Sequence, residues 1–516
     1  MKGDGLKTRH WIVLLLVILL GAYLRFHHLG TVPHWYPDEG SNVAVAAALA
    51  RGESAYMVFG QSSFINPRPC LFYLPLIVLF KLGGVDILWA RLLSASCGFL
   101  SLVLLYPVAR ALTDRRTALL AALFYAIYPA AVVYSRFAFT YDLLAPLYLL
   151  GLYALYKYLA SDRLLWLIGS ALCAGLALIT DLAGVTFFLF LFLALVVRRP
   201  RHLLPALPVS LFPLFVWGLW MWMVGGEAFL FDVRFTLSRT TASLGEQLAR
   251  VVFFYRAGLE GEVWLALGSL GLLALPERRS RWLLGGLHFG SLLFLTRTGA
   301  IFGLATYFLI PLFPVVSIGM GSLLSRGLLH LVETLEEDIS GALVGRWPPA
   351  AWRRRLTFLL VAVILFFVIF SPFVSMVYEG AFLGYSLFTV RLGATLADPG
   401  AAREVADYVN ARTSAGDVVL CSPTIAWLFD ANAADFQMAI AATGRATQHF
   451  PAGIPASRFR FDPRLENATY AVIDPLWRGW ASAQMPAVAM MVEEVETDWV
   501  LEANVGQFEV YRNPRR

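Results

Sequence analysis

Charged residues are scarce in this chain. Asp, Glu, Lys and Arg make up 15% of its 516 residues, whereas 59% of the residues are hydrophobic and the mean hydropathy is +0.67. This composition excludes an ordinary soluble protein and indicates a membrane protein with many spans. The net charge is only +6, and the basic residues gather in short loops between apolar runs, as they do in cytoplasmic membrane flanks. We therefore expect membrane lipids, and no nucleic acid, among its partners.

Cysteine is scarce as well. The chain has four cysteines, Cys70, Cys97, Cys173 and Cys421. They are scattered and have neither the spacing of a metal site nor that of a disulfide framework. A cleavage site of small residues is also missing after the apolar run 11–20. We therefore expect this run to be a membrane span rather than a cleaved signal.

The apolar runs predict eleven transmembrane helices, because each helix needs roughly 20 apolar residues to cross a bilayer. The predicted spans are 11–27, 87–111, 118–134, 143–159, 164–180, 183–197, 203–224, 262–275, 282–295, 303–324 and 356–377. A shorter apolar stretch, residues 70–82, is interrupted by Pro75. It is expected to form a re-entrant or surface helix.

The loop charges predict the orientation of the chain. The N-terminal end and every second loop are basic, with arginines at 115–116, 198–199, 278–279 and 353–355. Positive charge marks the cytoplasmic side, so the N-terminus is expected inside and, after eleven spans, the C-terminal region outside. We expect a multi-pass protein of the plasma (inner) membrane with a cytoplasmic N-terminus and an extracytoplasmic C-terminal domain.

The composition changes near residue 379 and predicts two domains. Residues 1–378 are expected to form a transmembrane domain, whose outer loop 28–86 carries an acidic pair, and residues 379–516 a small mixed α/β domain. The second domain is predicted to contain a helix from Asp398-Pro399 to about residue 412, strands at 418–421 and 470–473, and a hairpin of 499–503 and 507–511 that turns near Gly506. The expected fold class is an α-helical polytopic membrane protein with a C-terminal extracytoplasmic α/β domain.

The acidic pair is Asp38-Glu39, which follows the first span among aromatic residues and precedes an Ala-rich segment, 43–50. One interpretation is capping, since acids at a helix start satisfy its N–H groups and its dipole. The other is catalytic. A carboxylate near a low-dielectric boundary can have its pKa raised and act as a general base, with an orienting acid or a metal beside it.

A second acid lies between the third and fourth predicted spans. Ser135-Arg136 come first in this loop, and Tyr141-Asp142 follow. The charge pattern places the loop outside, so Asp142 is expected at the same face as the acidic pair. The alternative is a surface pair between Arg136 and Asp142, which would stabilise the protein little.

Arginines on outer segments form a third group. Arg68 lies between two prolines, Arg91 opens the second span, Arg239 lies between spans seven and eight, and Arg297 lies at the outer end of span nine. Such charges are rarer outside than inside, so a group of them indicates an anionic partner, and a lipid-linked phosphate is the natural one. The alternative is that some of them only anchor span ends at the headgroups.

In their order, these motifs resemble the GT-C superfamily of membrane glycosyltransferases, and within it the branch of the protein O-mannosyltransferases and the aminoarabinose transferase of lipid A. The pieces that carry the resemblance are Leu24-Arg25-Phe26, Tyr36-Pro37-Asp38-Glu39, Arg68-Pro69 with Tyr73, Trp89-Ala90-Arg91-Leu92, Ser135-Arg136 with Asp142, and Tyr307 with Pro311 and Pro314. They cover roughly the first 330 residues.

The resemblance implies a polyprenyl-phosphate sugar donor, transfer outside the membrane and inversion at the anomeric carbon. It implies that Asp38 is the base that activates the acceptor, that Asp142 is a second acid of the site, and that Arg68 contacts the donor phosphate. The expected catalytic residues are Asp38, Glu39 and Asp142. The expected substrate-binding residues are Arg68, Tyr73, Arg91, Arg136, Arg239, Arg297 and Tyr307.

The chain departs from the lipid A enzymes at Ser41, where they have Arg, and at Pro67, where they have a Glu implicated in metal binding. Asp181 stands where relatives often have a basic residue. A divalent metal at Glu39 or Asp142 and the identity of the acceptor therefore stay open. The alternative function is a transporter or flippase of a lipid-linked or amphiphilic solute, which predicts ionisable residues at mid-membrane and repeated halves. Acids at outer span ends and the lack of a clear repeat favour the transferase.

Overall fold

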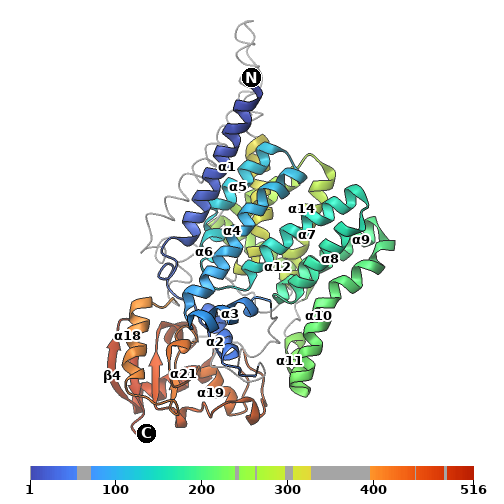
Figure 1. Ribbon diagram of the computed structural model, residues 1–516. Helices are drawn as coiled ribbons and strands as arrows, with labels where there is room; N and C mark the ends of the chain where they lie inside the picture. The colour runs from blue at the N-terminus through green and yellow to red at the C-terminus, as the bar shows by residue number, and fades with distance from the viewer. Residues whose placement is uncertain are drawn as a thin grey trace.

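The computed structural model describes residues 2–54, 71–238, 243–261, 264–296, 306–326, 396–447, 449–481 and 485–516. A bundle of helices makes up most of the molecule, and a smaller α/β domain lies at the end of the bundle away from the N-terminus (Figure 1). The predicted fold class, a largely helical chain with a small C-terminal sheet, is confirmed.

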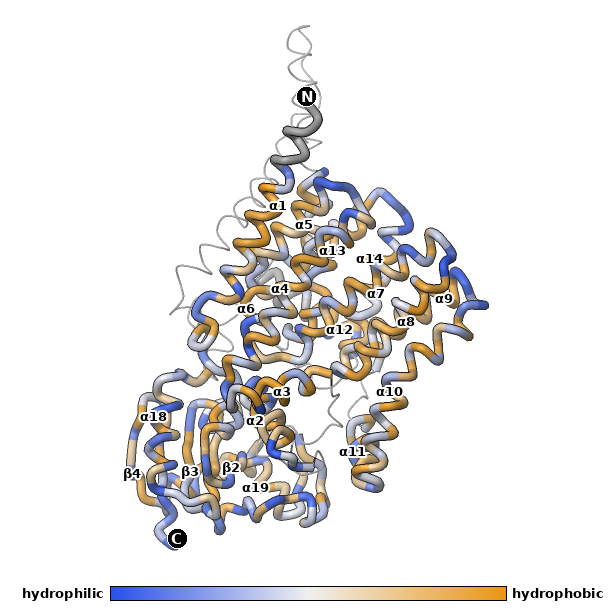
Figure 2. The backbone as a smooth tube through the Cα atoms, viewed as in Figure 1, coloured by the Kyte–Doolittle hydropathy of each residue, from blue (hydrophilic) through white to orange (hydrophobic). Residues whose placement is uncertain are grey.

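Most helices of the bundle follow the apolar runs of the sequence. They are α1 (Lys2–Phe26), α2 (Pro37–Ala50), α3 (Tyr73–Gly83), α4 (Ile87–Leu112), α5 (Arg115–Ile127), α6 (Pro129–Tyr134), α7 (Tyr141–Ser161), α8 (Leu164–Leu178), α9 (Val185–Arg198), α10 (Leu203–Gly225), α11 (Glu227–Ser238), α12 (Leu244–Gly261), α13 (Trp264–Leu273), α14 (Arg278–Leu295) and the 3-10 helix η3 (Thr306–Leu312). Figure 2 shows hydrophobic residues along most of the bundle and hydrophilic residues at its connecting loops. This distribution is typical of helices that lie in a bilayer.

Four helices in the described part of the chain are long and apolar enough to cross a membrane: Ile87–Leu112, Tyr141–Ser161, Pro200–Gly225 and Tyr307–Arg326. Shorter apolar helices, among them α3, α8 and α13, lie at or near other apolar stretches of the sequence. The eleventh predicted span, 356–377, lies outside the described residues. The count of eleven spans therefore stays a prediction.

Two segments differ from the prediction. The third span, predicted as one run, is divided into α5 and α6 at Pro129, whose missing N–H group cannot continue the helical hydrogen bonds. The segment predicted as an outer loop between spans seven and eight contains the helices α11 and α12. These two helices contain many polar residues, so a search for apolar runs does not find them.

Small residues let helices of the bundle approach closely. A Cβ atom added to Gly271 in α13 would lie 1.9 Å from the backbone oxygen of Gly319. Gly319 belongs to the helix Tyr307–Arg326, so this helix and α13 touch through their backbones. Such close packing holds membrane helices together, because lipid provides no hydrophobic driving force between them.

The C-terminal domain has a five-stranded sheet between layers of helices. Its elements are α18 (Pro399–Asn410), β1 (Val418–Leu420), β2 (Asn432–Ala434), α19 (Phe436–Ala442), β3 (Tyr470–Ile473), α21 (Pro486–Asp498), β4 (Val500–Val505) and β5 (Phe508–Arg512). The strand order is β2-β1-β3-β5-β4; β1 pairs in parallel with β2 and β3, and β5 pairs antiparallel with β3 and β4. Val419 joins the hydrophobic cluster of α18, and its neighbour Leu420 joins that of α19 and α21. Both faces of the sheet are thus covered, as parallel strands require.

The predicted elements of this domain are confirmed. Asp398 caps α18 by accepting a hydrogen bond from the Ala401 amide at 2.8 Å. Strands β1 and β3 lie where they were predicted, and the hairpin turns at Gly506, which has a φ of 58°. Strand β2 was not predicted, since its sequence Asn-Ala-Ala has none of the β-branched or aromatic residues that mark strands.

The domain contacts the segment that carries the acidic pair. Trp35 and Ala397 exchange two backbone hydrogen bonds of 2.9 Å. On α2, a Cβ atom added to Gly40 would lie 2.3 Å from the carbonyl oxygen of Pro423 and 2.7 Å from Thr424, which follow β1. The first turn of α2 therefore fits against the sheet domain only because residue 40 has no side chain.

Candidate active site

Two buried arginines hold the segment between α1 and α2. Arg91 of α4 donates from Nη1 to the carbonyl oxygens of Leu29 and Pro33 at 3.0 and 2.9 Å. Arg136 donates from Nη1 to Leu24 at 2.7 Å and from Nη2 to Val32 at 2.9 Å. Carbonyl oxygens that would otherwise lack partners are satisfied in this way, and the segment leading to the acidic pair is fixed in position.

Glu39, the second member of the pair, is fully buried. Its two carboxylate oxygens accept hydrogen bonds from Nε and Nη2 of Arg91 at 2.5 and 2.8 Å. They also accept from the backbone amides of Ala138 and Tyr36, each at 3.2 Å. These contacts use the carboxylate entirely within the protein, and they join α2, α4 and the segment before α7.

Asp38, the first member, has a different environment. It lies in the first turn of α2 and is partly exposed, whereas Glu39 is not. Its carboxylate interacts with the hydroxyl of Tyr307, which also hydrogen-bonds to Tyr36. The helix N-terminus favours negative charge at this position. Asp38 is thus the member of the pair that a substrate can reach.

Aromatic rings form the surroundings of Asp38. The ring of Tyr307 lies 5.1 Å from that of Phe139, 5.5 Å from that of Tyr141 and 4.8 Å from that of Phe308, measured between centroids. Burial, with a smaller contribution from Asp38, raises the pKa of Tyr36 well above its usual value. This hydroxyl therefore stays protonated at any physiological pH and can act as a hydrogen-bond donor.

The segment before α7 is fastened next to α2. Asn42 of α2 donates from Nδ2 to the carbonyl oxygen of Ala138 at 2.8 Å, and it accepts from the hydroxyl of Tyr73 at 2.6 Å. Thr140 donates to the carboxylate of Asp181 at 2.7 Å. Tyr73 and Asp181 thus fix α2 and the segment before α7 in position. Each uses its side chain in a hydrogen bond within the protein.

Asp142, the second predicted acid of the site, is more deeply buried than Asp38. It is buried at the start of α7, and its Oδ2 atom has no hydrogen-bond partner. The charged group that acts on it is Arg25 of α1, whose guanidinium donates to the carbonyl oxygens of Tyr125 and Ala126. Arg136 and Asp142 are both buried, so the alternative of a surface pair between them was wrong.

The remaining predicted arginines, Arg68, Arg239 and Arg297, lie outside the described residues. Sequence reasoning also left out Tyr36 and Tyr141 as parts of the site. Their positions beside the two acids were visible in the sequence, but only the fold shows that both rings meet Tyr307. Arg25 appeared only as one residue of a motif, and the structure shows it buried and bonded to the carbonyl oxygens of Tyr125 and Ala126.

A divalent metal is poorly matched by these residues. The two oxygens of Glu39 accept four hydrogen bonds, from Arg91, Ala138 and Tyr36, which use the roughly four lone-pair sites of the carboxylate. Within the described ranges, no three His, Cys, Asp or Glu side chains gather as a metal would need.

Comparison with known proteins agrees with this architecture. Residues 67–222 match the family model described as dolichyl-phosphate-mannose-protein mannosyltransferase. An uncharacterized protein of Aquifex aeolicus (strain VF5) is 29% identical over 237 residues, which are 42% of this chain and 45% of that protein. The match therefore spans a little less than half of the relative's length.

Two solved structures are similar over nearly the whole chain. One is ArnT from Cupriavidus metallidurans bound to undecaprenyl phosphate, with a TM-score of 0.62, 16% identity and coverage of 99% of this chain and 98% of that one. The other is the oligosaccharyltransferase AglB from Archaeoglobus fulgidus in complex with an inhibitory peptide and a dolichol-phosphate, with a TM-score of 0.53, 13% identity and coverage of 99% and 74%.

The apolar helices and these similarities make the chain an integral membrane protein. It has the fold of the GT-C membrane glycosyltransferases, and its predicted resemblance to the branch of the protein O-mannosyltransferases and ArnT is confirmed.

Proposed function

We propose that this protein is an inverting glycosyltransferase that moves a sugar from a polyprenyl-phosphate carrier to an acceptor hydroxyl at the outer face of the membrane. One observation carries the proposal. Asp38 is the accessible carboxylate of the pair, in the first turn of α2, while every oxygen of Glu39 is bonded within the protein. The fold adds support, because ArnT and AglB have it and their structures contain undecaprenyl phosphate and dolichol-phosphate.

In this reaction Asp38 takes the proton of the acceptor hydroxyl as its oxygen attacks the anomeric carbon. The bond from that carbon to the phosphate oxygen breaks, and the polyprenyl phosphate leaves. A single displacement from the face opposite the phosphate inverts the configuration. The Tyr307 hydroxyl orients the Asp38 carboxylate, and a positioned base of this kind contributes about 10²–10⁴-fold to the rate.

Glu39 and Arg91 act in this proposal as positioning residues rather than as base and phosphate ligand. Their bidentate pair fixes the first turn of α2 to α4 and so sets the direction of Asp38. Arg136 and Tyr73 serve the same purpose through the α1–α2 segment and Asn42. Asp142 shares its surroundings with Arg25, so we assign it an electrostatic role inside the bundle.

The leaving phosphate needs cations more than it needs an acid, since negative charge develops on its oxygens in the transition state. The described arginines that contact the α1–α2 segment are occupied, because Arg91 and Arg136 donate to its carbonyl oxygens. Arg68, Arg239 and Arg297 therefore remain the proposed contacts to the donor phosphate. Arg68 is the first choice, because prolines on both sides restrict its backbone.

A transfer assay tests the proposal. Purified full-length protein would be incubated with a panel of short-chain polyprenyl-phosphate sugars and with a cell-envelope fraction as the source of acceptors. We expect one donor to be consumed, with release of polyprenyl phosphate and a product whose anomeric configuration, read by NMR coupling constants, is opposite to that of the donor. Retention of configuration would contradict the inverting mechanism. Movement of intact donor across vesicles without transfer would support the flippase alternative.

A further inference from the structure

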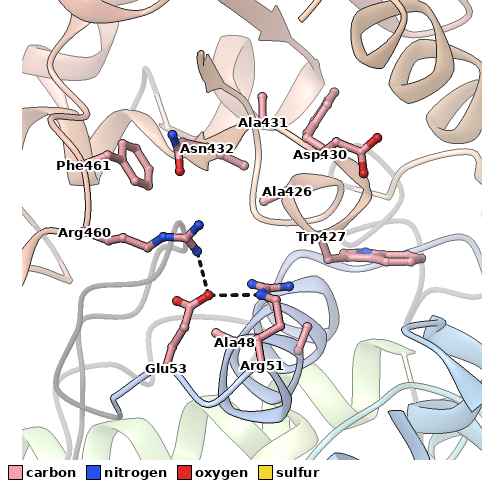
Figure 3. Close-up of a pocket in the computed structure, with 14 residues that line it drawn as sticks. Ala48, Arg51, Glu53, Ala426, Trp427, Asp430, Ala431, Asn432, Arg460 and Phe461 are labelled. Atoms are coloured by element: carbon pink, nitrogen blue, oxygen red, sulfur yellow. Dashed lines mark hydrogen bonds and ion pairs between the residues drawn. The ribbon is translucent and has the colours of Figure 1, made fainter. Parts of the chain in front are cut away.

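A polar cavity of about 300 Å³ lies between the end of α2 and the C-terminal domain (Figure 3). Small side chains of α2 form one wall, and the segment that runs from the 3-10 helix η4 (Ala426–Leu428) into β2 forms the other. Arg51 and Glu53 come from the end of α2, and Arg460 and Phe461 from the C-terminal domain. Clefts of this size at a boundary between domains are typical places for small-ligand binding.

The charged groups of the cavity are organised around Glu53. Its Oε1 atom accepts from Nε of Arg51 at 3.0 Å and from Nη1 of Arg460 at 2.6 Å. Each guanidinium has five N–H donors, and the contact with Glu53 uses one nitrogen of each. The remaining guanidinium N–H groups are available to a ligand. In Figure 3 the Arg460 guanidinium lies between Glu53 and Asn432 of the opposite wall, whose amide nitrogen donates to the carbonyl oxygen of Ala415 at 3.0 Å.

The segment that carries Arg460 is held on its other side too. Arg458 is buried and pairs with Asp232 of α11, with a shortest distance of 3.1 Å. This part of the C-terminal domain is therefore fixed between two elements of the membrane domain, Glu53 after α2 and Asp232 on α11. The cavity wall has a defined position rather than that of a loose loop.

The chemistry of the lining favours a saccharide. The four charged side chains, Arg51, Glu53, Asp430 and Arg460, sum to zero, which favours a neutral polyhydroxylated ligand over a phosphate. Planar guanidinium and carboxylate groups make paired hydrogen bonds to adjacent hydroxyls. The rings of Trp427 and Phe461, which also line the cavity, offer flat apolar surfaces to the C–H faces of a sugar ring. A volume of about 300 Å³ corresponds to roughly ten water molecules of ~30 Å³ each, which fits one or two sugar rings.

The cavity also lies at a suitable distance from the base. The α2 residues that line it, from Ala44 to Arg51, follow Asp38 by six to thirteen positions. At ~1.5 Å per residue this is roughly 9–20 Å along the helix axis. An acceptor that occupied the cavity with one sugar unit would reach Asp38 with a unit further along its chain.

We propose that this cavity is a subsite for the glycan part of the acceptor, and that the C-terminal domain selects acceptors through it. The inference rests on the proposed transferase function. It makes the acceptor an oligosaccharide, or a molecule that carries one, and excludes a bare peptide or a lone lipid headgroup.

The test is binding of the purified full-length protein to an array that contains neutral oligosaccharides, sulfated oligosaccharides and unglycosylated peptides. We expect neutral oligosaccharides to bind, and Arg460→Ala to weaken their binding at least tenfold. The matched control is Arg464→Ala, because Arg464 is another exposed arginine of the same domain, paired with Asp462 outside the cavity. It should bind the array as the unchanged protein does.

Asn432→Ala, which shortens a side chain of the opposite wall, gives a second readout that does not depend on Arg460. Both variants should raise the acceptor KM while kcat at saturating acceptor stays within about twofold. Binding of only sulfated glycans or only peptides, or neutral-glycan binding unchanged in both variants, would overturn the subsite. The Asp38→Asn variant should still bind glycans. Absence of transfer by the unchanged protein, together with intact glycan binding, would refute the proposed function and leave the subsite standing.

Discussion

The two carboxylates of the acidic pair show how far two neighbouring residues can differ. Asp38 is accessible and interacts with Tyr307, whereas Glu39 is buried in a bidentate pair with Arg91. The charge of a buried pair is tolerated because each partner compensates the other. We therefore expect opposite results when each carboxylate is neutralised separately.

Glu39→Gln should destabilise the protein strongly, because it leaves the Arg91 guanidinium buried without a counter-charge. Loss of one partner of a buried pair costs about 3–5 kcal/mol. Thermal unfolding of the purified protein should show a Tm lowered by several degrees, with Asp38→Asn as the matched neighbour that leaves Tm unchanged. An unaltered Tm for Glu39→Gln would show that the ion pair does not hold α2.

At the residue scale, the sequence could indicate the acidic pair, but not which member is accessible and which is buried. Arg91 lies 52 positions after Glu39, and no local pattern links them. The same holds for Arg136, which was predicted as an outer-face cation and instead donates to carbonyls of the α1–α2 segment. From the sequence alone, arginines near the outer ends of spans suited a phosphate site equally well. The carbonyl groups that Arg91 and Arg136 bind come close to them only in the folded chain.

Helix α2 is the element on which both parts of the molecule converge. Its first turn carries Asp38 toward the bundle, and Gly40 faces the C-terminal domain. The Ala-rich sequence that follows keeps this helix thin enough to pack on both sides. It also leaves the cavity beside Ala47 and Ala48.

Gly40→Ala should loosen the C-terminal domain from α2, because the added Cβ atom would meet the backbone of Pro423 and Thr424 at 2.3–2.7 Å. We expect a lower Tm and faster limited proteolysis between the two parts. Gly285→Ala is the control, since this glycine lies within α14 and has nothing within 4 Å of the added atom. Equal behaviour of the two variants would contradict the close approach.

The carboxylate that follows β2 should make the stability of the C-terminal domain depend on pH. Asp435 caps α19 by accepting from the Met438 amide at 2.7 Å, and burial raises its pKa to about 7. A raised pKa means that the folded state holds the proton more tightly than the unfolded state does. The stabilisation is therefore complete below the ordinary pKa of about 4 and is lost as the pH rises through 7.

Asp435→Asn keeps the cap but cannot ionise, so its Tm should rise relative to the unchanged protein between pH 4.5 and pH 8. Each pKa unit corresponds to about 1.4 kcal/mol. Asp417→Asn is a contrast of opposite sign, because hydrogen bonds from Ser414 and Thr469 lower the pKa of Asp417. That variant should lose Tm at pH 8. Parallel pH profiles for all three proteins would refute the role of Asp435.

Elements were easiest to predict where one signal was strong. The Asp-Pro start of α18, the strand β3 and the hairpin at Gly506 follow from local rules of capping, β-propensity and turn geometry. Helices α11 and α12 were not predicted, because they are not apolar enough to be spans. The contact of α11 with the distant Arg458 holds it in place, and that contact exists only in the folded chain.

On the scale of the whole molecule, α2, whose first turn carries Asp38, lies where the bundle meets the sheet domain (Figure 1). The loop charges predict that this boundary is outside the cytoplasm. The fold alone does not determine the direction in which the protein is inserted into the membrane. Orientation therefore needs a measurement of its own.

A single cysteine in place of Asp462, in a protein without its native cysteines, should react with a membrane-impermeant maleimide in intact cells. Asp462 is exposed and lies in the C-terminal domain. A cysteine in place of Arg281, in a basic loop predicted to be cytoplasmic, should react only after lysis. The reverse labelling pattern would place Asp38 inside the cell and remove the proposed donor from its reach.

The central claim, that Asp38 is the base of the transfer reaction, is tested most directly by the turnover of Asp38→Asn. Asp86→Asn is the matched control, since Asp86 is also a partly exposed acid at a helix start, where it accepts from the Leu88 amide at 2.7 Å. With both variants folded as judged by Tm, we predict that Asp38→Asn loses transfer by 100-fold or more, while Asp86→Asn stays within about twofold of the unchanged protein. Transfer by Asp38→Asn at the rate of the control would contradict the account.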